Sequence, residues 1–238
     1  MPREATHPLA KHPLDGLKGK PDCSLPMHHR VFLFTVMLEN SLRRCAPFVK
    51  GLTLDVGCGM RPYEKTFFAG ASKYLGADYL TDRSKPDVVC SALDLPFGDD
   101  EFDTVVSTEL LEHVPDPFRA MREMSRVLKP AGHLVLTTPM YWPRHEVPYD
   151  FFRYPYDGLL HLLKESGFEV VLLFNRGRSY AFVGQVLQHV QPIGNRLVNW
   201  IINRFFLWCD RHLSHDEITM GWTVVGRKNL QAPSAKLQ

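Results

Sequence analysis

The chain lacks the long apolar segments that membrane insertion or secretion would require. None of its apolar runs reaches the roughly 18 residues that a transmembrane helix needs. Its first residues are rich in proline and contain no apolar core of the kind found in a signal peptide. The sequence therefore predicts neither a transmembrane helix nor a secretory leader.

The chain also has few cysteines and a small net charge. The five cysteines are scattered without a C-x-x-C pair, which argues against a zinc site and favours reduced, buried thiols in a cytoplasmic protein. A formal net charge of +2 over 238 residues gives no strong positive field for nucleic acid. We expect a cytoplasmic protein without a nucleic-acid partner.

Length and composition fit one globular domain with additions, since 45% of the 238 residues are hydrophobic and 23% are charged. We expect a flexible arm over 1–26, because this stretch is rich in proline and lacks periodicity. A single domain is expected over 27–228, with a helical insertion at 178–218, and a loose polar tail over 229–238.

Short apolar runs of strand length alternate with amphipathic stretches of helix length. After a helical segment in 27–48, strands are expected at 53–56, 74–78, 88–90, 103–107, 133–138, 169–174 and 222–226, and helices at 62–68, 117–128 and 156–166. The alternation predicts an α/β fold, a doubly wound and mostly parallel sheet of seven strands with N-terminal helices and the insertion before the last strand. We expect the ligand beyond the carboxyl ends of the strands, near Gly57.

The first expected strand leads into a glycine turn that is typical of nucleotide-binding βαβ units. Residues 54–59 are L-D-V-G-C-G, and a second acid, Asp78, ends the next expected strand. The glycines let the backbone approach a ligand, and the second acid can hold ribose hydroxyls. Pro62 stands where a dinucleotide site has its third glycine, and Asp55 would repel a pyrophosphate. These two residues favour S-adenosylmethionine, which carries a sulfonium and an ammonium group, over a nicotinamide dinucleotide.

The D-x-G-x-G loop resembles the first motif of the class I S-adenosylmethionine-dependent methyltransferases. Three further segments follow in the order of that family: L-P-F-G-D-D-E-F-D at 95–103, L-E-H-V at 111–114 and R-V-L-K-P-A-G at 126–132. They are similar to the type 11 branch, which includes quinone- and sterol-type enzymes. The resemblance covers about residues 52–174 and implies a Rossmann-like methyltransferase fold with S-adenosylmethionine as cofactor.

The resemblance also implies roles for individual residues in the cofactor site. Asp55, Gly57 and Gly59 would form the loop beneath the methionine part of the cofactor. Asp78 would bind the ribose hydroxyls, and Leu93 with its neighbours would pack on the adenine.

Near the adenine this chain departs from the family pattern, and beyond the fourth expected strand one residue has an alternative role. The family often has an acid four residues before the L-P-F leucine, in contact with the adenine amino group. This chain has Ser91 there, and Asp94 is the acid that follows. Glu109 and His113 come after the fourth expected strand, near the reacting centre, and we assign Glu109 to the cofactor site. For His113, capping or packing of its helix is the alternative to catalysis.

Residues 139–154 follow the fifth expected strand and are dense in aromatic, acidic, basic and imidazole side chains. The sequence H-E-V-P-Y-D-F-F-R-Y at 145–154 resembles a subgroup of bacterial methyltransferases that occur among polysaccharide and glycan biosynthesis proteins. That resemblance implies a sugar or glycan substrate. The alternative is a lid, in which Arg153 pairs with Glu146 or Asp150 and the aromatic side chains pack over the cofactor.

Methylation of a hydroxyl oxygen needs a group that takes the hydroxyl proton. His145 is the first candidate for this base, because histidine titrates near neutral pH. Glu146 or Asp150 would orient His145 or act in its place. His145 and Asp150 could share a metal ion, but no cluster with metal-ligand spacing supports one, and no metal is predicted.

The insertion is rich in apolar and aromatic residues with interleaved arginines, most densely over 197–208. Two helices that cover the site or form a homodimer face would explain this composition. The alternative is a helix that lies on a membrane surface, with arginines at the lipid headgroups and aromatics below them.

The function that the sequence favours is S-adenosylmethionine-dependent methyl transfer to a hydroxyl oxygen of a sugar or glycan intermediate. Methylation of a lipid-like small molecule, such as a quinone precursor, is one alternative, which the apolar insertion favours. A protein that binds the cofactor without catalysis, as the partner of a glycosyltransferase, is the other.

Overall fold

The structure is a computed structural model and describes residues 24–82, 84–190, 195–214 and 218–230. Most of the expected arm (1–26) and tail (229–238) lies outside the described residues, so those two expectations stay predictions. No helix within the described ranges is both long enough and apolar enough to cross a membrane.

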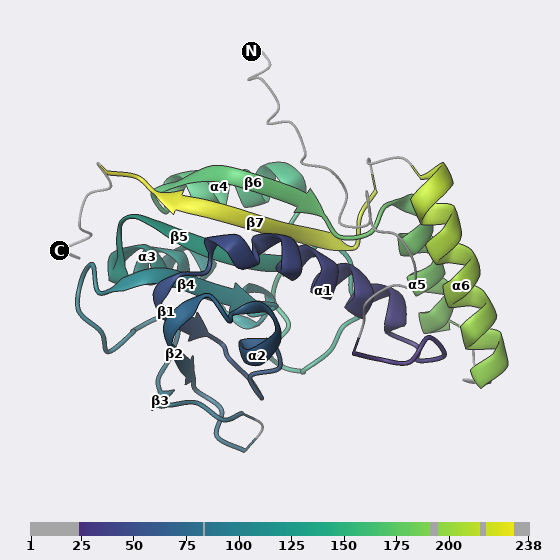
Figure 1. The fold of residues 1–238 in the computed structure, drawn as a ribbon, viewed down its shortest axis with the longest axis horizontal. Helices are drawn as coiled ribbons and strands as arrows, with labels where there is room; N and C mark the ends of the chain where they lie inside the picture. The colour runs from purple at the N-terminus through teal and green to yellow at the C-terminus, as the bar shows by residue number, and fades with distance from the viewer. Residues whose placement is uncertain (1–23, 83, 191–194, 215–217, 231–238) are drawn as a thin grey trace, which may run out of the picture.

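A seven-stranded sheet forms the centre of the fold (Figure 1). Its strands are β1 (Gly51–Val56), β2 (Ala71–Asp78), β3 (Val88–Val89), β4 (Phe102–Thr108), β5 (Leu128–Pro139), β6 (Phe168–Asn175) and β7 (Gly221–Lys228). Their order across the sheet is β3-β2-β1-β4-β5-β7-β6, and β7 runs antiparallel to both of its neighbours while the other pairs are parallel. The predicted α/β fold with a mostly parallel sheet is therefore confirmed.

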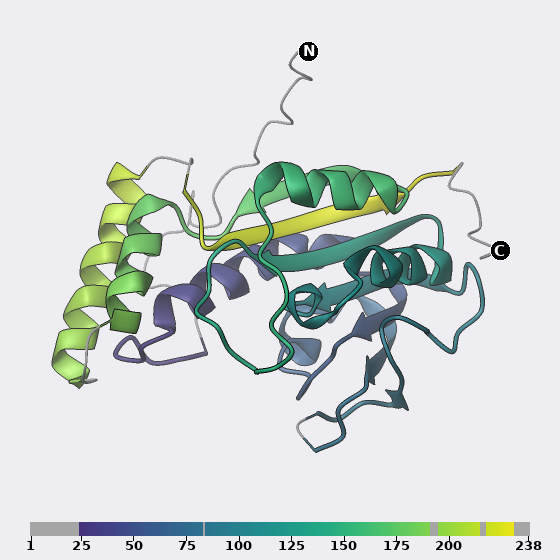
Figure 2. The same ribbon diagram turned by 180° about the vertical axis from the view of Figure 1, so that it is seen from behind.

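Helices cover both faces of the sheet. They are α1 (Phe32–Cys45), α2 (Glu64–Phe67), α3 (Pro117–Val127), α4 (Tyr156–Glu165), α5 (Ser179–Val190) and α6 (Arg196–Leu213), with short 3-10 turns at Ala46–Phe48 (η1) and Leu111–His113 (η2). α1 and α2 lie in front of the sheet in Figure 1, whereas α3 and α4 lie in front of it in Figure 2, which shows the opposite side. The paired α5 and α6 stand at one end of the molecule, next to α1. The two covered faces show the doubly wound arrangement.

Two apolar cores form because successive side chains of a strand point to opposite faces. Val105 packs on the side of α3 and α4, whereas its neighbour Val106 packs on the side of α1 and α2. Met121 and Met124 of α3 are fully buried in the first core. Truncation of either to alanine would cost about 2–5 kcal/mol of stability. The sheet edge that carries the site is therefore held from both faces.

The insertion packs on the rest of the domain through a third apolar cluster. Leu33 of α1, Ala181 of α5 and Leu207 of α6 meet in it. The α5 and α6 backbones approach closely at Gly184, where an added Cβ would lie 2.6 Å from Cβ of Phe206. The predicted pair of helices is therefore present in the insertion, although 191–194 and 215–217 lie outside the described residues.

The local predictions differ from the structure mainly at two places, because β5 begins at Leu128 rather than at 133 and the first helix after β1 is short. The helix expected at 62–68 is only Glu64–Phe67. Arg61 lies immediately before the expected helix start at 62 and has a φ of 59°. This left-handed conformation is not that of an α-helix. By contrast, α4 ends where predicted, because Gly167 follows it with a φ of 82°.

Candidate active site

The chain turns at the carboxyl end of β1 through Gly57 and Gly59, whose φ angles are 76° and 51°. Side chains other than that of glycine rarely adopt this region. At Gly57 an added Cβ would also lie 2.8 Å from Cδ1 of Leu110, whereas at Gly59 it would meet nothing within 4 Å. Position 57 therefore requires glycine, both because its φ is positive and because Leu110 leaves no room for a Cβ. At Gly59 the space above the turn is open.

Asp78, the last residue of β2, fixes this turn. Its Oδ2 accepts the backbone N–H of Gly59 at 3.0 Å, and its Oδ1 accepts the backbone N–H of Leu80 at 2.9 Å. The carboxylate thus lies beside the glycine turn, where the predicted ribose contact requires it.

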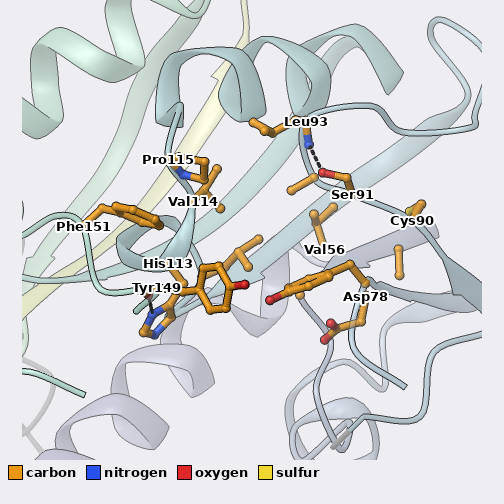
Figure 3. Close-up of a pocket in the computed structure, with 15 residues that line it drawn as sticks. Val56, Asp78, Cys90, Ser91, Leu93, His113, Val114, Pro115, Tyr149 and Phe151 are labelled. Atoms are coloured by element: carbon orange, nitrogen blue, oxygen red, sulfur yellow. Dashed lines mark hydrogen bonds between the residues drawn. The ribbon is translucent and has the colours of Figure 1, made fainter. Parts of the chain in front are cut away.

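A pocket of about 270 Å³ opens next to the turn, beyond the carboxyl ends of the strands (Figure 3). Its walls are mainly apolar and include Val56, Leu93 and Val114. Asp78 lies toward one end, and His113 lies with Tyr149 toward the other. An apolar cavity with a few polar groups at its ends is the usual form of a small-molecule site.

The structure brings some of the predicted cofactor residues to this pocket and leaves others outside its lining. Gly57, Asp78 and Leu93 line it. Asp94 is exposed outside the lining, and Ser91 takes the place beside Leu93. The reason is a tight turn in which the backbone N–H of Asp94 donates to the carbonyl of Ser91 at 3.1 Å. The expected adenine contact of Asp94 is therefore not supported by its position.

Asp55 lies beneath the glycine turn and outside the pocket lining. It is buried, its Oδ2 accepts the hydroxyl of Tyr74, and its Oδ1 has no hydrogen-bond partner. Burial raises the pKa of Asp55 to about 7. A positive charge near the turn would favour its ionised form, in keeping with the predicted role under the methionine part.

Glu109 is not among the residues that line the pocket, and its carboxylate pairs with a cation that the sequence did not indicate. Arg176, at the end of β6, is fully buried, and its Nη2 lies 3.0 Å from the Glu109 carboxylate and 2.9 Å from the carbonyl of Thr138. Glu109 has a φ of 49°, an uncommon conformation for a residue other than glycine. Its assignment to cofactor contact is thus not supported, because the carboxylate is held by Arg176.

His113 connects η2 to the segment 139–154. Its Nδ1 lies 2.6 Å from the carbonyl oxygen of Tyr149, so Nδ1 carries the proton and donates it. The other nitrogen, Nε2, lies 3.8 Å from Oε1 of Glu112 and 3.9 Å from Oε2 of Glu146. The ring of His113 thus packs within the segment, and its Nε2 lies near two carboxylates, so both the packing role and a catalytic role stay predictions.

Asp150 holds His145 and is itself held by Arg153. The guanidinium of Arg153 donates to both carboxylate oxygens, at 2.5 and 2.9 Å. The Asp150 Oδ2 accepts the backbone N–H of His145 at 3.0 Å and lies 3.5 Å from its Nδ1. The hydrogen bonds from Arg153 hold the pKa of Asp150 well below its usual range. Asp150 can therefore orient His145 but is a poor proton acceptor.

Of the two pairings considered for Arg153, the structure shows the one with Asp150. Glu146 is exposed and faces His113 rather than Arg153 or His145. The rings of His113 and His145 meet edge to face, with centroids 4.6 Å apart. The three predicted catalytic residues are thus brought to the rim of the pocket, where His113 joins them.

Glu112 is the site residue that sequence reasoning missed, although it belongs to the L-E-H-V segment. Its side chain is only 2% exposed, and its Oε2 has no hydrogen-bond partner. Burial, and then the negative charge of Glu109, hold the pKa of Glu112 well above its usual range. A buried carboxyl group with an unpaired oxygen and a strongly raised pKa is a candidate functional position.

Comparisons with known proteins agree with this geometry. Residues 54–136, which contain the glycine turn, Asp78 and Glu112, match a family described as "Methyltransferase domain". An uncharacterized methyltransferase of Mycobacterium leprae is 34% identical over 103 residues, which are 39% of this chain and 38% of that protein. The chain thus spans well under half the length of this relative.

Solved structures extend the likeness to most of the chain. A methyltransferase of Haloferax volcanii, solved in complex with the activator Trm112, aligns with a TM-score of 0.57 at 19% identity over 81% of this chain and 89% of that one. An S-adenosylmethionine-dependent methyltransferase of Mesorhizobium loti aligns with a TM-score of 0.54 at 20% identity over 82% of this chain and 100% of that one. At such identities the likeness shows the fold. Residues 54–136 therefore match a methyltransferase domain, and the chain has the Rossmann-like fold of solved S-adenosylmethionine-dependent methyltransferases.

Proposed function

We propose that the chain transfers the methyl group of S-adenosylmethionine to a hydroxyl oxygen of a sugar or glycan intermediate. The observation that carries this proposal is the position of His145. It is fixed by Asp150 and packs against His113, which itself lines the pocket. A group able to take a proton thus stands at the rim of a site shaped for the cofactor.

The residues around the pocket fit the cofactor. Gly57 leaves no room for a side chain, Asp78 can bind ribose hydroxyls with the lone pairs not used by Gly59 and Leu80, and Leu93 offers an apolar wall for adenine. When bound, S-adenosylmethionine supplies a methyl group on a positively charged sulfur, and its transfer leaves a neutral thioether. Asp78 supplies negative charge on the side of the turn, and Asp55 would add to it when the positive charge of the cofactor favours its ionised form.

In this proposal His145 accepts the proton that the hydroxyl loses. Its Nδ1 faces the carbonyl oxygen of Pro143 at 3.2 Å and Oδ2 of Asp150 at 3.5 Å, so Nδ1 carries the ring proton. Nε2 then has the free lone pair. As the new oxygen–carbon bond forms and the carbon–sulfur bond breaks, the hydroxyl proton passes to Nε2. A positioned base of this kind contributes about 10²–10⁴-fold in rate.

A sugar-like acceptor suits the mixed surface of the rim. His113, His145 and Glu146 offer several hydrogen-bonding groups within a small region. Tyr149 and Phe151 line the pocket and remain exposed, so they present aromatic surface toward an incoming substrate. Alternating hydroxyl and C–H surfaces of a sugar would meet both kinds of group.

A transfer assay tests the proposal. Purified protein with methyl-labelled S-adenosylmethionine would be incubated with nucleotide sugars, lipid-linked glycans and quinone precursors, and the products identified by mass spectrometry. Methylation of a hydroxyl in the first two groups is expected. Methylation of the quinone precursors alone, or cofactor binding without transfer to any acceptor, would overturn the sugar assignment.

The outer face of α6 favours a second candidate, an acceptor carried in a membrane. Leu197, Ile201, Phe205 and Trp208 share one side of the helix and are 51–65% exposed. Arg196 and Arg204 are exposed on the same helix. Such a face suits a peripheral contact of a cytoplasmic protein with an anionic membrane, and a homodimer face is the alternative.

The insertion also contacts the acceptor side of the site. Tyr141 packs against Phe182 of α5 with ring centroids 4.9 Å apart, and Trp142 packs against His189 at 4.8 Å. A membrane-bound α6 would therefore stand close to the segment that meets the acceptor. A lipid-linked glycan would satisfy both the polar rim and the apolar helix.

A further inference from the structure

We propose that Glu112, His113 and His145 hold a divalent metal ion at the rim of the pocket. One ligand atom from each of these three residues lies within 4.8 Å of the others. Glu112 and His113 belong to η2 after β4, and His145 comes from the segment after β5. The cluster exists only because the fold brings the two segments together, which is why the spacing of the sequence did not indicate a metal.

The distances leave room for an ion. Bonds of about 2.0–2.2 Å place two ligand atoms of a tetrahedral ion roughly 3.4 Å apart. His113 Nε2 lies 3.8 Å from Oε1 of Glu112, so a shift of a few tenths of an ångström would bring this pair to ligand spacing. Oε2 of Glu146 lies 3.9 Å from the same nitrogen and is the nearest further carboxylate.

The hydrogen bonds of the two histidines match those of metal ligands. A metal-bound histidine usually donates its other ring N–H to a carbonyl or a carboxylate, which fixes the tautomer and the ring orientation. His113 Nδ1 donates to the carbonyl of Tyr149 at 2.6 Å. His145 Nδ1 faces the carbonyl of Pro143 at 3.2 Å and the carboxylate of Asp150 at 3.5 Å. Both rings are therefore oriented through Nδ1 and keep Nε2 free for an ion.

Glu112 supplies an independent observation. Its side chain is buried, and its Oε2 lacks a hydrogen-bond partner. Two guanidinium groups lie nearby, but their printed ion pairs are with other carboxylates, Arg176 with Glu109 and Arg153 with Asp150. A buried carboxyl oxygen without a hydrogen-bond partner remains next to two imidazoles. A bound cation would satisfy it.

The ligand types indicate the class of ion. Two imidazole nitrogens and one carboxylate oxygen suit Zn²⁺ and Mn²⁺ better than an ion that prefers oxygen ligands alone, such as Ca²⁺. Three protein ligands leave at least one coordination position open. Since His113 lines the pocket and His145 belongs to the segment after β5, an ion held by both would lie between the pocket and that segment.

The ion would change the role of His145. A lone pair on Nε2 that binds a metal cannot also accept a proton. The ion would instead lower the pKa of an acceptor hydroxyl bound at the open position. The hydroxyl proton would then pass to the exposed carboxylate of Glu146, while the oxygen forms its bond to the methyl carbon. This part of the inference rests on the proposed methyl transfer, whereas the metal site itself does not.

Metal binding can be measured without cofactor or acceptor. Full-length protein freed of metal by a chelator would be titrated with Mn²⁺, followed by electron paramagnetic resonance, and with Zn²⁺ in a calorimeter. We expect one ion per chain at micromolar concentration. His113→Gln and Glu112→Gln should each weaken binding at least about tenfold, which is the cost expected for a lost ligand. The exposed His161→Gln variant is the matched control and should bind as the parent protein does.

The outcomes separate this site from the proposed function. Circular dichroism would verify that each variant is folded, and His113→Gln, on a partly exposed side chain, serves if the buried Glu112→Gln does not fold. S-adenosylmethionine titrated into the same samples would report the cofactor site separately. No stoichiometric metal binding by folded protein, or equal binding by His113→Gln and His161→Gln, would overturn the proposal even if the cofactor binds normally.

Discussion

His113 and His145 meet edge to face, with ring centroids 4.6 Å apart and planes that cross at 73°. His113 follows β4 and lines the pocket, and His145 belongs to the segment after β5. Asp150 and Arg153 hold the second ring, and the carbonyl of Tyr149 holds the first. This contact joins the pocket proposed for the cofactor to the segment proposed to meet the acceptor.

Replacement of His145 tests its part in the reaction. His145→Gln should lower the turnover number about 10²–10⁴-fold, because the variant loses a proton acceptor or a metal ligand. The affinity for S-adenosylmethionine should change little, since His145 lies outside the pocket lining. Steady-state kinetics and calorimetry measure the two quantities. Unchanged turnover in His145→Gln would exclude both roles, and His161→Gln is the control.

Replacement of Arg153 tests how His145 is oriented. Arg153→Lys keeps the charge but loses the two-point contact with Asp150 and the hydrogen bonds to the carbonyl of Trp142 at 3.0 and 3.1 Å. We expect a roughly tenfold or larger fall in turnover with little change in cofactor affinity. The exposed Arg144→Lys in the same segment is the matched control. Equal activity of the two variants would contradict the orienting role of Asp150.

The turn at Gly57 can be tested by a single methyl group. In Gly57→Ala the new Cβ would lie 2.8 Å from Cδ1 of Leu110 at a φ of 76°. The turn must shift, and S-adenosylmethionine affinity should fall at least about tenfold, or ~1.4 kcal/mol. Gly98→Ala is the control, because its nearest neighbour, Oε2 of Glu101, would be at an ordinary 3.5 Å. Calorimetry that finds equal affinities for both variants would speak against this turn as the cofactor site.

Asp55 makes the stability of the free protein depend on pH. Burial raises its pKa from an ordinary 3.8 to about 7, so the folded state binds the proton more tightly than the unfolded state. Between about pH 4 and 7 the folded form keeps a proton that the unfolded form has lost. The contribution of Asp55 to the free energy of unfolding therefore falls as the pH rises from about 4 to 7, by about 1.4 kcal/mol per pH unit and roughly 4 kcal/mol in total.

Asp55→Asn removes this titration and should be more stable than the parent protein above pH 7, but it should bind S-adenosylmethionine more weakly. Denaturant unfolding at pH 5 and pH 8 measures the effect. Glu112 and Asp210 also have raised pKa values from burial, so the difference between parent and variant is the informative quantity. If the free energies of unfolding of the parent protein and Asp55→Asn differ by the same amount at pH 5 and at pH 8, Asp55 does not titrate in this range.

The exposed face of α6 can be tested with vesicles. The parent protein should float with vesicles of phosphatidylcholine and phosphatidylglycerol, and a Phe205→Ser/Trp208→Ser double variant should bind at least about tenfold more weakly, because it loses apolar anchors. Val183→Ser on α5 is the control. If the parent protein does not bind vesicles but sediments as a dimer, and the double variant sediments as a monomer, the exposed face of α6 is a homodimer interface instead.

The sheet could be predicted from the sequence because its signals are local. Short apolar runs separated by glycine, proline and polar turns mark the strands, and the D-x-G-x-G turn with Asp78 marks the switch point. The short α2 could not be predicted, since nothing in the local sequence indicates the left-handed conformation of Arg61, whose guanidinium pairs with Asp87 and Glu64. Local patterns thus indicate elements, and tertiary contacts set their ends.

The candidate site was predictable only where it follows the strands. Gly57, Asp78 and Leu93 line the pocket because strand ends converge at one edge of the sheet. Glu112 lies in the L-E-H-V segment, but its burial could not be predicted, and Arg176 gave no local signal, because burial is defined by neighbours that are distant in the sequence. The choice of Asp150 over Glu146 as the partner of His145 likewise depends on how the segment folds back.

Calorimetric titration of the purified protein with S-adenosylmethionine and its demethylated product, with NADH as control, tests the cofactor site most directly. We predict binding of one molecule of each of the first two per chain at micromolar concentration, and no binding of NADH. A folded protein that binds neither of the first two, or that binds NADH in their place, would contradict the assignment of this pocket to S-adenosylmethionine.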